Sequence, residues 1–316
     1  MSDRLRRSSM ARTVLLLFGA AVLCLPAASE MKVPAVVRGP AGEFVTDASP
    51  ASLQAWIEDQ PAAIQSVQGP GANLVLLVVM DLVGDLNRIE AARNGLIEAL
   101  EEMGPNEYVA VLQAQDGLEV LQDPATDRDL VRETVLGVPV SGYPGLLETV
   151  EDVAAIGDSI LRDSDVRVAV LYLTDGSIFQ YRGGYTNPVI NPSDHSDLSR
   201  RFRDRLIQER ISGILKAIRT SWTPLFFLHL QNRQDNLNTA YQNGITQFAQ
   251  ETGGQALFCN SVAQVPAYLA QLMAQIRNLY SVELQVPDGL QGRVRVRLEA
   301  SPGQGVVFPP QVSLEK

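Results

Sequence analysis

The sequence predicts an α/β protein: a doubly wound, mainly parallel sheet with small β segments at both ends of the chain. Between residues 69 and 280, apolar runs long enough for buried strands alternate with segments whose apolar residues recur at helical spacing. This alternation requires crossover helices between neighbouring parallel strands. Residues 30–68 and 281–316 instead contain short apolar stretches cut by Gly, Pro and Asp, which indicate short strands and tight turns.

Residues 1–29 have the organisation of a secretory signal peptide. Four arginines precede the apolar stretch VLLLFGAAVLCL, and the small residues of PAASE follow it. The apolar stretch is shorter than the roughly 20 residues that a membrane-spanning helix needs, although a retained N-terminal anchor is the alternative. The sequence therefore predicts export to the periplasm or beyond the cell, with no membrane span in the mature chain.

The net charge limits the classes of partner, and the cysteine content limits how the fold can be stabilised. Without residues 1–29 the chain keeps 26 − 4 = 22 basic and 36 − 1 = 35 acidic residues, a net charge of −13. Such a charge repels nucleic acid and anionic lipid. Cys259 is then the single cysteine, so no internal disulfide can form, and we expect this residue to be a small buried hydrophobe.

The strands and helices of the central region can be predicted in order. Continuous apolar runs such as NLVLLVVMD indicate strands that are covered on both faces. We expect strands at residues 73–81, 107–114, 166–176, 223–230 and 255–259. We expect helices at residues 87–103, 146–161, 198–219, 239–252 and 263–280, and a short helix before Gly137.

Two of these helices carry sequence signals for their ends. Asn87 and Glu90 have the spacing of an N-terminal capping box. Thr126 and Asp129 can cap the short helix, which Gly137 is expected to end.

The β segments at the two ends of the chain are each too small to be stable alone. We therefore expect residues 30–68 and 281–316 to pack together, with the α/β region inserted between them. In the stretch GRVRVRLEA, valines and a leucine alternate with arginines, which indicates a strand with one apolar and one charged face.

Aspartates follow two of the predicted strands and are the first candidates for a site. Asp81 ends the run LVVMD, and Asp175 follows LYLT. Because parallel strands end at the same edge of a sheet, we expect the two side chains to lie close together. From the residues alone, the pair is compatible with a metal site, a catalytic pair, or two residues that cap turns.

Several pieces of the chain, in this order, resemble the von Willebrand factor A (VWA) family: NLVLLVVMD, VLYLTDGS, FAQETGGQALF and IRNLYSVEL. The stretch GEFVTDASPASLQAWIEDQPAAIQSV resembles the β preamble of the bacterial secreted proteins called VWFA-related. The resemblance covers nearly the whole mature chain. It implies a VWA, Rossmann-like fold over residues 69–280 and an adhesion or scaffolding role in which a divalent cation bridges the domain and its partner.

The same resemblance implies a degenerate metal site. The family motif, Asp-x-Ser-x-Ser with a later Thr and Asp, maps its aspartates onto Asp81 and Asp175, but Val83 and Asp85 stand at the serines and Pro144 at the threonine. Asp81, Asp85 and Asp175 could still hold Mg²⁺ or another divalent cation. Three carboxylates would then repel the acidic group of a partner. The alternative is that these aspartates cap turns and helix starts.

A polar loop at residues 177–197 leaves the same edge of the sheet as Asp175. It contains residue types that are enriched at interaction hot spots. The candidate partner-binding residues are Phe179, Tyr181, Arg182 and Tyr185. The alternative is a loop whose aromatic side chains fold back over the end of the sheet.

No motif for catalysis stands out. The sequence has no phosphate-binding loop, no Gly-x-Ser-x-Gly elbow and no paired zinc histidines. We therefore expect an exported, non-enzymatic protein-interaction module with a protein partner and no certain cofactor. The alternatives are a structural envelope protein without a defined ligand, or a VWA domain that still binds its ligand through a divalent cation.

Overall fold

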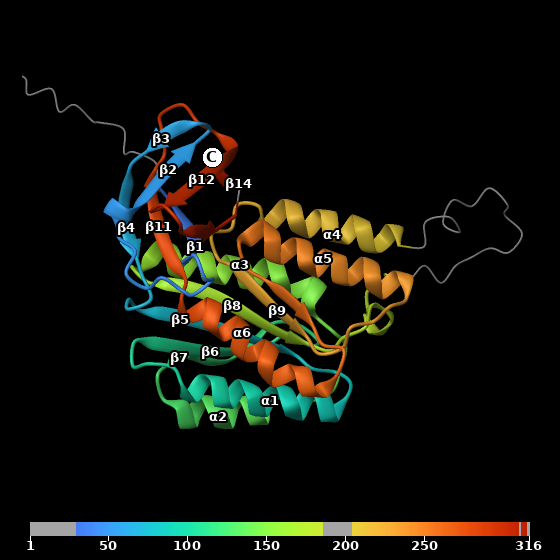
Figure 1. Cartoon of the computed structure of the whole chain (residues 1–316). Coiled ribbons are helices and arrows are strands. Elements are labelled where there is room, and N and C mark those ends of the chain that lie inside the picture. The colour runs from blue at the N-terminus through green and yellow to red at the C-terminus, as the bar shows by residue number, and fades with distance from the viewer. Residues whose placement is uncertain (1–29, 186–203, 310, 315–316) are drawn as a thin grey trace, which may run out of the picture.

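The computed structural model describes residues 30–185, 204–309 and 311–314, and its centre is a six-stranded sheet of order β10-β9-β8-β5-β6-β7 (Figure 1). Its strands are β5 (Leu74–Asp81), β6 (Glu107–Gln113), β7 (Glu119–Ala125), β8 (Arg167–Thr174), β9 (Leu225–His229) and β10 (Ala256–Phe258). All neighbours are parallel except β7, which pairs antiparallel with β6. The mainly parallel sheet is confirmed, and β7 is an edge strand that the sequence did not reveal.

Helices cover both faces of this sheet. They are α1 (Leu86–Glu101), α2 (Arg128–Gly137), α3 (Leu146–Asp163), α4 (Arg205–Ile218), α5 (Asn236–Thr252) and α6 (Val265–Arg277). One core contains residues of α1, α2 and α6, and the other contains residues of α3, α4 and α5. The predicted doubly wound arrangement is therefore confirmed. Three short 3₁₀ turns complete the described region: η1 (Pro50–Ser52), η2 (Ile178–Gln180) and η4 (Val262–Gln264).

The central strand β5 shows why its sequence has no polar face. Successive side chains of a strand point to opposite sides of the sheet. Leu76 and Val78 accordingly lie in the core under α1 and α6, whereas Leu77 and Val79 lie in the core under α3 and α5. Every residue of the strand is buried. A continuous apolar run is what such a position requires.

The two ends of the chain form one β module, as predicted. Its strands are β1 (Glu30–Arg38), β2 (Leu53–Ile57), β3 (Gln60–Ala62), β4 (Ile64–Gln68), β11 (Tyr280–Gln285), β12 (Gly292–Ala300), β13 (Gly305–Val307) and β14 (Gln311–Leu314). They make two four-stranded sheets, β13-β1-β11-β4 and β14-β12-β2-β3, over a third hydrophobic core. N-terminal strands pair with C-terminal ones in both sheets, β1 with β11 and β2 with β12.

A buried arginine joins the β module to the α/β region. Arg167, at the start of β8, is 1% exposed. Its guanidinium donates to the carbonyls of Pro70 and Ala72, at 2.9 and 2.8 Å, in the connection that leads into β5. It also donates to the carbonyls of Arg277 and Leu279, at 2.9 and 3.1 Å, in the connection that leaves α6. One side chain therefore holds both connections between the β module and the α/β region.

Two predicted helix caps are wrong. Asp85, not Asn87, caps α1, and Asp127, rather than Thr126 or Asp129, caps α2. In both cases the carboxylate one residue before the helix accepts hydrogen bonds from the N–H groups of its first turn, which a residue inside the turn is poorly placed to do.

Parts of the sequence predictions fall on residues that the structure does not describe. The signal peptide at 1–29 lies outside the described residues, as do residues 186–197 of the polar loop and the expected start of the helix at 198. That helix is described from Arg205 onward. Within the described ranges, no helix combines the length and the apolar character needed to cross a membrane.

Candidate functional site

Asp81 and Asp175 lie side by side at the edge where the parallel strands end, called the top edge below. Asp81 is the last residue of β5 and stands opposite Thr174 of β8, so the predicted proximity is confirmed. Asp81 is fully buried. Its Oδ1 accepts from the backbone N–H of Gly145 at 2.9 Å, and its Oδ2 accepts from the Thr174 hydroxyl at 2.9 Å. Burial raises the pKa of Asp81 to about 7, against the lowering effect of these bonds.

Asp175 holds the loop between β5 and α1. It is 1% exposed, and its Oδ1 and Oδ2 accept from the backbone N–H groups of Val83 and Asp85 at 2.8 and 3.0 Å. Burial raises the pKa of Asp175, and these hydrogen bonds oppose the shift. A Cβ on Gly84 would lie 2.7 Å from Asp175 Oδ2, so the loop can wrap the carboxylate only with glycine at this position.

Replacing Gly84 by alanine is therefore expected to lower the free energy of unfolding by about 1–3 kcal/mol, because the new methyl group displaces a hydrogen-bonded carboxylate. Urea denaturation measures the change. The matched control is Gly71→Ala, where a Cβ meets no atom within 4 Å. This control should change stability by less than about 0.5 kcal/mol. Equal effects of the two variants would contradict the loop-holding role of Asp175.

Asp85, the third predicted metal ligand, is engaged with the start of α1. Its Oδ1 accepts from the backbone N–H groups of Asn87 and Arg88 at 3.0 and 3.4 Å. Its Oδ2 lies 3.3 Å from Arg88 Nε. The carboxylate therefore acts as a helix cap with a neighbouring cation, a role that stabilises the helix N-terminus.

The residues present do not fit an octahedral Mg²⁺ site. Mg²⁺ requires about six oxygen ligands in near-ideal geometry. Val83 has no side-chain oxygen, and Pro144 packs against Gly176, whose Cβ would lie 2.8 Å from the proline ring. The oxygens of Asp81 and Asp175 already accept from donors of the chain itself. In the described ranges no group of three or more His, Cys, Asp or Glu side chains is arranged to hold a metal ion.

Two of the four predicted partner-binding residues are exposed at the top edge. Phe179 is 57% exposed, and the side chain of Arg182 is 71% exposed. Arg182 donates to Asp116 Oδ1 at 3.1 Å, and its guanidinium lies 4.7 Å from the centre of the Tyr143 ring. Tyr143, itself 46% exposed, was not predicted, although an aromatic residue in the Gly/Pro-rich stretch SGYPG was a usable signal.

The other two predicted residues turn inward. Tyr181 is only 5% exposed, and its hydroxyl is 2.9 Å from that of Tyr241 in α5. The prediction that Tyr181 meets a partner is therefore wrong, because the ring packs into the core under α3, α4 and α5. Tyr185 is half-buried and packs edge-on against Tyr181, while its hydroxyl donates to Glu148 Oε1 at 2.8 Å.

The histidine and the cysteine of the described part of the chain, His229 and Cys259, are both buried. His229 is fully buried between the Gly176 carbonyl, 3.1 Å from its Nε2, and the Gln231 N–H, 3.2 Å from its Nδ1. Burial lowers the pKa of His229 to about 4. Burial raises the pKa of the Cys259 thiol, which is 1% exposed, to about 11. The prediction that Cys259 is buried is confirmed.

Comparison with known proteins gives similarities of fold alone. No family model matches the sequence, and no curated protein matches it. Among solved structures, a von Willebrand factor type A protein from Catenulispora acidiphila is 10% identical with a TM-score of 0.44, covering 91% of this chain and 75% of that one. The vWF domain of the type V pili tip protein Mfa5 from Porphyromonas gingivalis is 12% identical with a TM-score of 0.45. The match covers 65% of this chain and 95% of that domain.

The PilB minor pilin from Streptococcus sanguinis is 15% identical with a TM-score of 0.46. The match covers 65% of this chain and 61% of the pilin, so this chain spans less than two thirds of that protein.

Proposed function

We propose that the chain is an exported, non-enzymatic protein-interaction module that binds a protein partner at its top edge without a bridging cation. The observation that carries the proposal is a set of large exposed side chains from three separate segments around this edge: the start of α1, the loop between α2 and α3, and the turn η2. Leu86, Tyr143 and Phe179 are 63%, 46% and 57% exposed. Export rests on the signal peptide predicted from the sequence.

Contacts within the protein tie these segments to one another. Asp85, adjacent to Leu86, donates its backbone N–H to Asp175, which lies four residues before Phe179. Arg182 of the Phe179 loop contacts the Tyr143 ring. These contacts hold the three segments together at the top edge, and aromatic residues with arginine are the types that dominate binding energy at protein interfaces.

The electrostatics of the top edge favour contact through these side chains over contact through the aspartates. Asp81 and Asp175 are buried and bonded to the chain, so an incoming partner meets the apolar and aromatic groups first. Arg182 is already ordered by Asp116 and Tyr143, which reduces the entropy lost when it contacts a partner. The chain carries a net charge of −10, which disfavours nucleic acid.

The proposal predicts that Tyr143→Ala combined with Phe179→Ala weakens partner binding by roughly thirtyfold or more, the effect of losing about 2 kcal/mol at a hot spot. The partner is first captured with the immobilised wild-type chain from the extracytoplasmic fraction, identified by mass spectrometry and purified. Its dissociation constant is then measured for both proteins, with and without EDTA.

The matched control is Leu130→Ala with Leu136→Ala, two residues of α2 that are each 46% exposed. This control should bind like the wild type, and EDTA should change nothing. Undiminished binding by the Tyr143/Phe179 variant would refute the proposed surface, and loss of binding in EDTA would refute the absence of a bridging cation.

A further inference from the structure

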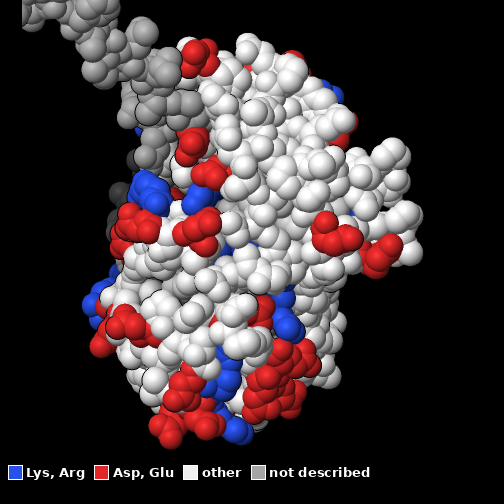
Figure 2. All heavy atoms as spheres, turned by 90° about the vertical axis from the view of Figure 1, so that its left-hand side faces the viewer, with Lys and Arg blue, Asp and Glu red and all other residues white. Residues whose placement is uncertain are grey.

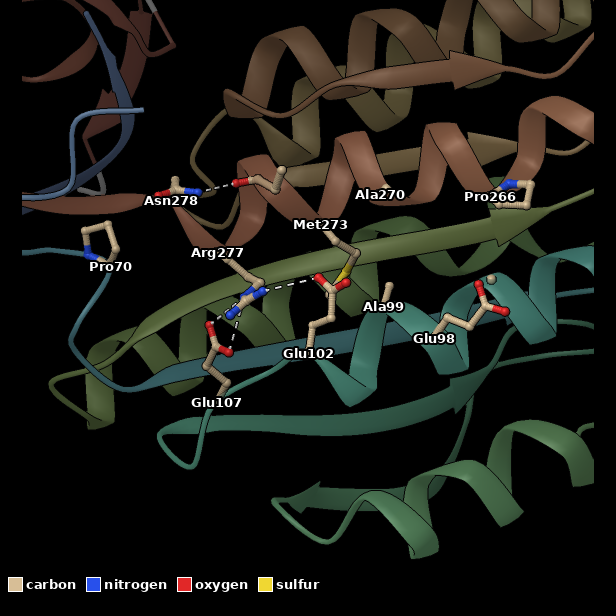
Figure 3. Close-up of a pocket in the computed structure, with 12 residues that line it drawn as sticks. Pro70, Glu98, Ala99, Glu102, Glu107, Pro266, Ala270, Met273, Arg277 and Asn278 are labelled. Carbon is tan, nitrogen blue, oxygen red and sulfur yellow. Dashed lines mark hydrogen bonds and ion pairs between the residues drawn. The ribbon is translucent and has the colours of Figure 1, made fainter. Parts of the chain in front are cut away.

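A groove with a volume of about 440 Å³ lies between α1 and α6, away from the top edge (Figure 3). It runs from Gly95 and Pro266 to Pro70 and Asn278, where the chain passes between the α/β region and the β module. The groove is lined by residues of α1 and α6, by Pro70 in the connection before β5, and by Glu107 of β6. None of these residues belongs to the top edge, so the proposed function does not use the groove.

The floor of the groove is apolar. Gly95 allows α6 to pack directly on the backbone of α1, since a Cβ there would lie 3.1 Å from Leu269 Cδ1 and 3.4 Å from Pro266 Cα. Farther along, Ala99, Ala270 and Met273 line the groove. Such a surface can receive aliphatic groups.

The rim of the groove is acidic. Glu98, Glu102 and Glu107 line it together with a single cation, Arg277. Arg277 Nε lies 3.4 Å from Glu107 Oε2, and its NH1 group lies 3.8 Å from Glu102 Oε2. Figure 3 shows the guanidinium between these two carboxylates. Glu98 and Glu102 are exposed, whereas Glu107 is buried and lies near Arg128 and Arg167 as well as Arg277. The negative charge of the groove that a ligand can reach therefore lies on Glu98 and Glu102.

The C-terminal end of α1 adds to this negative potential independently of the side chains. Both α1, which ends at Glu101, and α6, which ends at Arg277, end beside the groove, but the last carbonyls of α6 are already bonded to Arg167. The C-terminal end of a helix carries a partial negative charge, so acidic residues there destabilise the helix. Figure 2 views the side on which both helices end and shows acidic side chains gathered over its lower part.

We propose that this groove binds a short basic, amphipathic segment of a partner protein. The ammonium or guanidinium group of the segment lies between Glu98 and Glu102, and its aliphatic portions cover Ala99 and Met273. The charge complementarity selects a cationic ligand, and the apolar floor selects one with aliphatic stems, as lysine and arginine have. The site is separate from the top edge, so both can be occupied together.

The test is fluorescence anisotropy with a labelled seven-residue peptide that alternates lysine with leucine and alanine, added to the purified full chain. A peptide with glutamate in place of lysine should not bind. Glu98→Gln with Glu102→Gln should weaken binding about tenfold, as expected for two lost charge contacts. Ala270→Trp, a substitution at an exposed position of the lining, should fill the groove and weaken binding at least as much.

The control for net charge is Glu119→Gln with Asp123→Asn, two exposed residues of β7. It removes the same charge away from the groove and should leave the affinity unchanged. Equal weakening by this control, or full binding by Ala270→Trp, overturns the proposal. Binding of spermine that Ala270→Trp abolishes, without binding of the peptide, also overturns it, in favour of a small polyamine ligand.

Discussion

Replacing Arg167 by methionine is expected to lower the free energy of unfolding by about 4 kcal/mol, the order of loss seen when a buried charged group that holds several partners is removed. Arg167 is 1% exposed and donates to four backbone carbonyls, two in each connection between the β module and the α/β region. Methionine fills a similar space but donates no hydrogen bond, so these carbonyls lose their partner in a buried place.

The charge of Arg167 is tolerated because the carbonyl groups around it carry partial negative charge. Two of them, those of Arg277 and Leu279, follow the C-terminal end of α6, where a cation is favourable. Burial lowers the pKa of Arg167 to about 10, with Glu107 acting in the opposite direction. The guanidinium therefore stays charged at neutral pH and holds both connections.

Urea denaturation of Arg167→Met, Arg167→Lys and Arg132→Met distinguishes this role from a general effect of lost charge. Lysine has three donors on one nitrogen and cannot span both connections as the planar guanidinium does, so it should recover only part of the stability. Arg132 makes a surface ion pair with Glu101 at 3.6 Å, and its loss should cost less than about 1 kcal/mol. A loss below that limit for Arg167→Met would contradict the joining role.

The buried strands could be predicted because their physical requirement is local. A strand covered on both faces needs apolar residues along its interior, and residues 74–80 of β5 and 168–173 of β8 meet that requirement without reference to the rest of the chain. The antiparallel strand β7 could not be predicted this way. Its sequence EVLQDPA is mostly exposed and contains Pro124, which a strand tolerates only where it lies at the edge of a sheet.

The candidate site was predictable in position but not in its bonding. The placement of Asp81 and Asp175 follows from the two strands that they end. Apart from the Thr174 hydroxyl, however, their partners are backbone N–H groups of Val83, Asp85 and Gly145, which every residue except proline provides. Residue types therefore give no sign that these carboxylates are already engaged.

The inward position of Tyr181 was hidden for a related reason. Its hydroxyl partner, Tyr241, lies 60 residues away on α5, and the packing of α5 on the sheet decides which loop side chains are covered. Phe179, two residues earlier in the same loop, is exposed. Composition alone could not separate the two rings.

Replacing Asp81 by asparagine is expected to make the protein more stable at pH 8 and to leave its stability nearly unchanged at pH 4. In the unfolded chain the carboxyl group has its ordinary pKa of 3.8, whereas in the folded protein burial raises the pKa to about 7. Between these values the folded state keeps a proton that the unfolded state has released. The stability that the protonated group contributes is therefore complete below pH 3.8 and is lost as the pH rises through 7.

The size of the effect follows from the difference between a pKa of 3.8 in the unfolded chain and about 7 in the folded protein, which corresponds to about 4 kcal/mol. Asparagine stays neutral at every pH and can reproduce the hydrogen bonds of the protonated acid: its Oδ1 can accept from Gly145, and its Nδ2 can donate to the Thr174 hydroxyl, which rotates. The free energy of unfolding of Asp81→Asn minus that of the wild type should thus grow by about 4 kcal/mol between pH 4 and pH 8.

Asp175→Asn is the matched comparison, because the two aspartates differ in the donors that face them. Both oxygens of Asp175 accept from backbone N–H groups, those of Val83 and Asp85, so an amide nitrogen in place of either oxygen meets a donor that cannot rotate away. This variant should be destabilised at pH 4 and at pH 8 alike. Urea denaturation between pH 4 and pH 8 measures the free energy of unfolding of both variants and the wild type. If the difference between Asp81→Asn and the wild type stays constant over this range, Asp81 is charged throughout. Its bonds to Gly145 and Thr174 then outweigh the cost of burying the charge.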